Sequence, residues 1–237
     1  MKRLTAQQIH DLGPCGHDRT DNGKHYTLAQ VKRLMVQVVG KRRMTITAMD
    51  ILKARKLGLL SWSDFWWIII KAHLPASEAQ ALLDADADPK ADNSYALRWA
   101  AEYGHTEVVK LLIPVSDPKA NNSGALRRAA IYGHTEIVKV LIPVSDPDDY
   151  GGALRGAARN GHTEIVKVLI PFSDPKAYNS GALWWAAEYG HTEVVKLLIP
   201  VSDPKANNSG ALRRAAIYGR TEIARVLKAA IEKRGGE

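Results

Sequence analysis

Residues 124–142, GALRRAAIYGHTEIVKVLI, decide the fold of this chain, because their apolar positions recur with helical spacing. Leu126, Ala129 and Ala130 stand at i, i+3 and i+4, which places them on one face of a helix. Gly133 follows, and glycine often ends helices because it adopts the left-handed conformation at little cost. The stretch therefore begins with a short helix whose inward face is mostly alanine.

The rest of the stretch predicts a second helix. Thr135 offers a hydroxyl N-cap, and Glu136 suits the positive end of the helix dipole. The apolar face of this helix consists of Ile137, Val138, Leu141 and Ile142. Pro143 cannot continue the hydrogen-bond ladder and helps to end the helix. Residues typical of turns follow, so the unit is a helix, a turn, a helix and a loop.

Five copies of this unit follow one another at a nearly constant spacing. The glycine of the G(H/R)TE turn occurs at Gly104, Gly133, Gly161, Gly190 and Gly219. The Ala-Leu pair of the first helix keeps the same phase, and both markers step by 29, 28, 29 and 29 residues. One such unit cannot bury its apolar face alone, so its stability must come from contacts with adjacent units. We therefore predict an all-α solenoid of stacked helix pairs.

The pattern xALxxAAxxGHTEVVKLLI resembles the ankyrin repeat over about residues 88–237. The AA-x-x-GH-x-E-V-V-K-L-L core matches closely, whereas the family's TPLH tetrad is replaced by YALR, GALR or GALW. The period is 29 residues instead of about 33, and the missing residues fall in the loop. The resemblance implies an ankyrin-like helical-repeat solenoid with short loops in place of β-hairpins. It also implies that four histidines bond to backbone and hold the helix pair: His105, His134, His162 and His191.

The chain divides into three predicted parts. These are a basic N-terminal helical domain (residues 1–61), a degenerate N-capping repeat (62–87), and five ankyrin-like repeats with a C-terminal capping helix (88–237). The capping repeat is indicated by Ser77–Glu78, which aligns with Thr106–Glu107 one period later. The final helix lacks the proline stop and is more polar than its equivalents, as the end of a solenoid requires.

The first part carries most of the positive charge. Residues 1–80 hold 13 Lys/Arg and 6 Asp/Glu, out of 33 and 25 in the whole chain. Capping-box spacings and glycines predict helices at about 5–12, 28–39 and 47–57, packed on the first repeat through Trp62, Trp66 and Trp67. The basic patch consists of Lys32, Arg33, Lys41, Arg42, Arg43, Lys53, Arg55 and Lys56. Such a patch suits nucleic acid, an acidic protein surface or simply water.

Other features narrow the functional class. The lone cysteine, Cys15, excludes a disulfide framework and favours a reducing, cytoplasmic location. No apolar run reaches the roughly 18 residues of a membrane span. His10, Cys15, His17 and His25 lie close together, but their spacing matches a zinc site poorly, so we expect no metal and no cofactor. The chain has no Gly-rich phosphate loop, HExxH or GxSxG motif, and we expect no enzymatic activity.

The two residues that follow each Ala-Ala pair differ between the units, whereas the Ala-Ala pair before them and the G(H/R)TE turn after them recur in every unit. The ankyrin resemblance implies that these positions line a concave groove and contact a protein partner. They are Glu102, Tyr103, Ile131, Tyr132, Arg159, Asn160, Glu188, Tyr189, Ile217 and Tyr218. Tyrosine is common among interface anchors, but the alternative is that these rings pack between neighbouring units. Just upstream, arginine and tryptophan alternate, which favours stacking of the two.

The sequence therefore predicts a non-enzymatic binding module or inhibitor. It would recognise a folded protein partner through the concave face of the repeats, in the manner of a viral or bacterial effector. The alternative is a nucleic-acid-associated protein that binds through residues 1–61, with the repeats as a scaffold.

Overall fold

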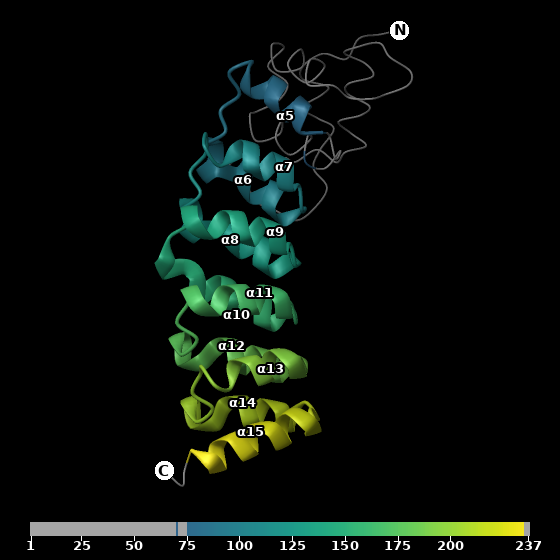
Figure 1. The fold of residues 1–237 in the computed structure, drawn as a ribbon, viewed down its shortest axis with the longest axis vertical. Coiled ribbons are helices and arrows are strands. Elements are labelled where there is room, and N and C mark those ends of the chain that lie inside the picture. Colours follow the sequence, from purple (N-terminus) through teal and green to yellow (C-terminus); the bar gives the residue numbers. More distant parts are fainter. Residues whose placement is uncertain (1–69, 71–74, 235–237) are drawn as a thin grey trace, which may run out of the picture.

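A computed structural model describes Ile70 and residues 75–234, and the structural statements below concern these residues. They form an elongated stack of helix pairs, arranged along the molecule in the order of the chain (Figure 1). The described part contains helices and loops without a strand. The predicted all-α helical-repeat solenoid is confirmed.

Each unit contributes a first and a second helix, and we number the units one to five. The first helices are α6 (Ala91–Glu102), α8 (Ala120–Tyr132), α10 (Tyr150–Arg159), α12 (Ala177–Tyr189) and α14 (Ala206–Ile217). The second helices are α7 (Thr106–Leu112), α9 (Thr135–Leu141), α11 (Thr163–Leu169), α13 (Thr192–Leu198) and α15 (Thr221–Lys233). One more helix, α5 (Ala76–Leu83), precedes unit one. Three short 3-10 helices lie in the loops, η1 (Ile142–Val144), η2 (Pro147–Asp149) and η3 (Ile170–Phe172).

Alanine forms the contact between successive first helices. Ala129 and Ala130 of α8 are fully buried, as is Leu126 on the same face. Neighbouring first helices pack closely along much of their length, whereas neighbouring second helices meet over a shorter stretch. The small side chains permit this close approach, because a methyl group keeps the two backbones only slightly apart. The core therefore runs as one continuous layer through all five units.

The chain enters four of the five first helices through a left-handed turn. At the start of α8, Asn121, Asn122 and Ser123 have φ values of 55°, 54° and 46°, a region that asparagine tolerates better than most residues. The Ser123 hydroxyl is buried and accepts the N–H of Asp146 in the next unit at 2.9 Å. The same bond joins two other pairs of units at 2.8 and 2.9 Å. These compact turns stand where the resemblance predicts short loops.

The predicted N-cap role of Thr135 is wrong. Helix α9 begins at Thr135, and His134 holds the cap position with φ −88° and ψ 76° and without a side-chain cap hydrogen bond. The starts of α7, α11 and α13 have the same geometry. Arg220 at the start of α15 has the same geometry, so the residue before the threonine takes the cap position in all five units and the threonine lies inside the first helical turn. The predicted role of Gly133 is confirmed, since its φ of 86° is left-handed.

Both ends of the described stack differ from its interior. Helix α5 lies next to unit one and buries Leu82 completely (Figure 1). Helix α15 has 13 residues, whereas the other second helices have 7, and Arg234 after it donates to the Ser202 carbonyl at 2.9 Å. The boundaries at residues 61 and 87 stay predictions. The helices expected within residues 1–61, and Trp62, Trp66 and Trp67, lie outside the described residues.

Two identical stretches allow the packing of first helices to be tested. Residues 120–133 and 206–219 both read ANNSGALRRAAIYG, yet Ala130 is fully buried and its equivalent Ala216 is exposed. Ala130→Leu should lower the free energy of unfolding by about 1–3 kcal/mol, because the larger side chain separates α8 from α10. Ala216→Leu should change it by less than about 0.5 kcal/mol. Urea denaturation followed by circular dichroism measures both, and equal losses would contradict the packing described.

Candidate partner-binding surface

A ladder of hydrogen bonds ties each unit to the one before it. Nε2 of His105, His134, His162 and His191 lies 2.9, 2.8, 2.9 and 2.9 Å from the carbonyl oxygens of Ile70, Glu102, Ile131 and Arg159. A carbonyl oxygen only accepts, so each Nε2 carries the proton and donates. Arg220 replaces the fifth histidine and donates from Nε to the Glu188 carbonyl at 3.3 Å.

This ladder corrects one expectation from the ankyrin resemblance. The histidines do bond to backbone, but the bond joins consecutive units and does not hold a helix to its own partner. A carbonyl at the end of one first helix is thereby satisfied by the next unit. The stack is therefore tied by directional bonds as well as by apolar contact.

The rings of His134, His162 and His191 also each cover a glycine of the preceding unit. Gly161 has a φ of 74°, and a Cβ built on it would lie 2.5 Å from Nδ1 of His191. Glycine is thus required both for its left-handed backbone and for the space of the ring. Gly219 has a similar φ of 66°, but among the described residues nothing lies within 4 Å of its Cβ position. The covered glycines mark the line along which successive units meet.

The variable side chains form a surface that we call the first-helix face. It comprises the two residues before and the two residues after each Ala-Ala pair. These are Arg98, Trp99, Glu102 and Tyr103; Arg127, Arg128, Ile131 and Tyr132; Arg155, Gly156, Arg159 and Asn160; Trp184, Trp185, Glu188 and Tyr189; and Arg213, Arg214, Ile217 and Tyr218.

The first residue after each Ala-Ala pair contacts the next unit. The Glu102 carboxylate lies 2.9 Å from Nη1 of Arg128, and the Glu188 carboxylate lies 3.5 Å from Nε of Arg214. Ile131 packs on Gly156, where a Cβ would stand 2.7 Å from its Cγ1. Arg159 places Cζ 4.8 Å from the centre of the Trp185 ring. These four residues therefore pack between units, whereas the alternative that the sequence left open concerned the tyrosine rings at the second position.

The second residue after each pair is more open to solvent. Tyr132, Tyr189 and Tyr218 are 49%, 42% and 47% exposed. Asn160 is exposed as well, whereas Tyr103 is half-buried. Ile217 belongs to the first set of positions but is 71% exposed, because no described unit follows α14. Of the ten predicted contact residues, Glu102, Ile131, Arg159 and Glu188 thus contact the next unit, and Tyr132, Asn160, Tyr189, Ile217 and Tyr218 are exposed without a hydrogen bond or ring contact to a following unit within the described residues.

Arginine and aromatic side chains stack along this face, as their alternation predicts. Arg214 lies over the Trp184 ring with Cζ 4.5 Å from the centre, and Arg155 lies over Tyr178 at 4.2 Å. Trp184 meets Trp185 edge-on, with ring centres 4.4 Å apart. These contacts fix long side chains that would otherwise be mobile in water, so the face presents an ordered array of guanidinium groups and rings.

Ion pairs cross between units at positions that the sequence did not predict. Arg128 and Arg214 were not among the predicted contact residues, although each follows its glutamate by 26 residues. That shared spacing, just short of one period, is the signal that could have identified them. The Glu102 carboxylate also reaches the Tyr132 hydroxyl. Burial and then this carboxylate raise the pKa of Tyr132 above its ordinary value.

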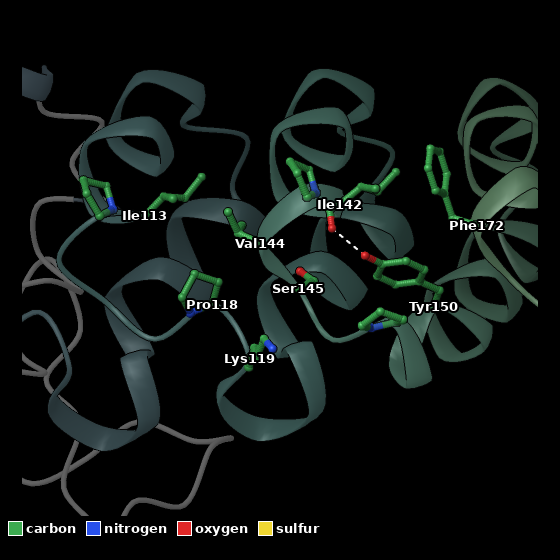
Figure 2. Close-up of a pocket in the computed structure, with 11 residues that line it drawn as sticks. Ile113, Pro118, Lys119, Ile142, Val144, Ser145, Tyr150 and Phe172 are labelled. Atoms are coloured by element: carbon green, nitrogen blue, oxygen red, sulfur yellow. Dashed lines mark hydrogen bonds between the residues drawn. The ribbon is translucent and has the colours of Figure 1, made fainter.

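A separate hollow of about 820 Å³ lies beside the loops of units one to three (Figure 2). Its lining is mainly apolar, and the Tyr150 hydroxyl donates to the Ile142 carbonyl beside it. Ser145 in this lining is 5% exposed, and its hydroxyl has no hydrogen-bond partner among the described residues. The equivalent Ser116 and Ser202 donate to proline carbonyls. The hollow lies where the third unit is one residue shorter than the others. There α10 begins directly at Tyr150, whereas the other first helices begin with a left-handed turn.

Several predicted sites fall elsewhere. The basic patch from Lys32 to Lys56 and the cluster from His10 to His25 lie outside the described residues. Within Ile70 and 75–234, no group of three or more His, Cys, Asp or Glu side chains is placed to hold a metal ion. The described helices include none that is long and apolar enough to cross a membrane.

Comparison with known proteins identifies the repeats. A family model described as "Ankyrin repeats (3 copies)" matches residues 69–150 and again residues 154–234. The two matches cover most of the chain and reach all five units, with residues 151–153 of unit three between them. Among curated proteins, a search finds no significant match.

The contact between glycine and histidine can be tested with a matched pair of substitutions. Gly161→Ala places a methyl group against the His191 ring, whereas Gly219→Ala meets no described atom, and both have a left-handed φ. Gly219→Ala should cost about 1 kcal/mol of the free energy of unfolding through backbone strain alone. Gly161→Ala should cost at least about 1 kcal/mol more. Thermal and urea denaturation give both values, and equal costs would refute the ring contact.

Proposed function

This chain belongs to the ankyrin-repeat family, and on that premise we propose that it binds a folded protein partner through its first-helix face. Ankyrin repeats are protein–protein interaction modules, and the family is generally a non-enzymatic scaffold. The proposal adds to this the surface used and the kind of partner.

The observation that supports the proposal most is the contrast between the two faces of the stack. The second helices carry a regular solvated pattern, in which Glu107 pairs with Lys110 at 2.8 Å and three later units repeat the pair. The first-helix face instead exposes Tyr132, Tyr189 and Tyr218 among arginines. Protein interfaces are enriched in tyrosine, tryptophan and arginine and depleted in lysine and glutamate. The first-helix face has the composition of an interface, and the second helices have that of a solvated surface.

The form of the surface favours a macromolecule over a small ligand. The exposed side chains come from helices of five consecutive units, held in register by the histidine ladder. A solenoid of this kind offers an extended and preorganised surface, so a partner loses little free energy in ordering it.

Narrower roles stay proposals. The chain would act as an inhibitor if the partner surface that it covers contains the partner's own active or binding site. The role of a viral or bacterial effector rests on the family resemblance alone. A cytoplasmic location rests on the single cysteine. The nucleic-acid alternative depends on basic residues outside the described part of the chain, and no structural observation favours it.

Replacing the exposed tyrosines tests the proposal. A partner would first be isolated from the native source with the full-length protein as bait and identified by mass spectrometry. The triple variant Tyr132→Ala, Tyr189→Ala and Tyr218→Ala should then bind the purified partner at least about tenfold more weakly, since buried interface tyrosines often contribute 2 kcal/mol or more. Biolayer interferometry measures the affinity.

A matched variant controls for general effects. Lys110→Ala, Lys139→Ala and Lys196→Ala change three exposed positions on the second helices and should leave the affinity within about twofold. Circular dichroism confirms that each variant is folded. An unchanged affinity in the folded tyrosine variant would rule out the first-helix face as the contact surface.

A further inference from the structure

Outside helix α15, which carries both Arg225 and Lys228, the two kinds of basic residue are separated between the two layers of the stack. The first helices α6, α8, α10, α12 and α14 contain seven arginines and no lysine. The second helices α7, α9, α11 and α13 each contain one lysine and no arginine. Both side chains are charged and tolerate exposure to water, so the need for a solvated surface does not by itself explain why the first helices carry only arginine. Arginine differs by its planar fork of N–H groups, which matches a carboxylate with two parallel hydrogen bonds.

The arginines are held over aromatic rings. Arg155, Arg159 and Arg214 lie with Cζ 4.2, 4.8 and 4.5 Å from the centres of the Tyr178, Trp185 and Trp184 rings. Stacking occupies the flat side of a guanidinium and leaves its N–H edge to an acceptor. Arg159 uses part of that edge on the Tyr189 hydroxyl, at 3.0 Å, and Arg214 faces Glu188 at 3.5 Å. The side chains are thus ordered before any partner arrives, which reduces the entropy lost on binding.

The first-helix face holds more positive charge than its own carboxylates neutralise. Its only acidic residues are Glu102 and Glu188, and each is paired with an arginine of the next unit. Within the described residues, no carboxylate oxygen lies within 4 Å of the guanidinium groups of Arg127, Arg155 or Arg213.

Repulsion between neighbouring arginines is visible at the start of this face. Burial, and after it the charge of Arg128, lowers the pKa of the Arg98 guanidinium, with a smaller contribution from Arg127. Nε of Arg98 is buried and has no hydrogen-bond partner among the described residues. A negative group placed against the face would offset this repulsion.

We propose that the first-helix face binds an acidic segment of a protein partner, with aspartate or glutamate side chains against the arginines and apolar side chains against the exposed tyrosines. This inference rests on the proposed function and specifies the partner for the same surface. Carboxylates are the complement of guanidinium groups that have no carboxylate of their own, as in Arg127, Arg155 and Arg213.

Single-stranded nucleic acid fits the same surface less well. Its bases bind by stacking on open aromatic faces. Here Arg214 covers a face of Trp184, Arg159 covers a face of Trp185, and the two indoles meet edge to face. These two indole rings therefore serve to hold the guanidinium groups and offer a poor platform for bases.

The test uses the full-length protein and three fluorescein-labelled probes at physiological ionic strength. The probes are a glutamate-rich peptide with interspersed leucines, its glutamine analogue, and a single-stranded RNA. The arginine variant carries Arg127→Gln, Arg155→Gln and Arg213→Gln. The control carries Lys110→Gln, Lys139→Gln and Lys196→Gln, which removes the same charge from the second helices and leaves residues 1–61 intact.

Fluorescence anisotropy should show that the wild-type protein binds the glutamate peptide more tightly than the glutamine analogue. The arginine variant should bind the glutamate peptide roughly tenfold more weakly, whereas the lysine control should change by less than about twofold. Circular dichroism would confirm that both variants are folded.

Four results would overturn the inference. They are no binding of the glutamate peptide, equal binding of its glutamine analogue, equal weakening by the two triple variants, and RNA binding that only the arginine variant loses, which would assign the face to nucleic acid. None of the first three affects the proposed function, because the tyrosine variant tests that separately against the isolated partner. If the tyrosine variant loses partner binding and any of these three results is also found, the first-helix face remains the partner-binding surface but its preference for acidic segments is refuted.

Discussion

The rings of His134, His162 and His191 each donate Nε2–H to a carbonyl of the preceding unit and cover that unit's glycine, and both contacts need two stacked units. The same is true of the buried alanines, which meet only across the boundary between first helices. A single unit would leave a carbonyl without its partner and an apolar face in water, and both cost free energy. The ankyrin-type stack is therefore stable as a series of interfaces, and a single unit has little stability of its own.

This constraint also shapes the surface. In units one to four, the first of the two residues after the Ala-Ala pair contacts the next unit. The contact is an ion pair at Glu102, an aliphatic contact at Ile131 and a stacked cation at Arg159. The second residue is more exposed, as at Tyr132 and Tyr189, although the Tyr189 hydroxyl also accepts a hydrogen bond from Arg159 of the preceding unit. The first-helix face thus combines fixed stacking residues with variable exposed ones, so its surface chemistry can vary while the stack is retained.

Much of the fold follows from the sequence because its signals are local and repeated. The phase of the glycines, the alanine pairs and the aliphatic positions of the second helices predict the helix pairs and their burial, as at Leu126 and Val138. Other features depend on contacts between units. Thr135 has the chemistry of an N-cap, but the histidine before it is turned toward its neighbour and takes that position. The pairing of Glu102 with Arg128, and the hollow beside Tyr150, arise only when units of slightly different length are stacked. The candidate contact residues were identified as a set from sequence, but only the structure separates those that stack from those that are exposed.

Hydrogen exchange at one interface tests this account most directly. His162→Ala removes the bond to the Ile131 carbonyl between units two and three, whereas His162→Arg keeps a donor, as Arg220 does at the last interface. We expect the amides of α8 and α10 to exchange roughly tenfold faster in the alanine variant, with a much smaller change in α14 and partial recovery in the arginine variant. Unchanged exchange at α8 and α10, or an equal increase in all units, would contradict the claim that the units are stabilised one interface at a time.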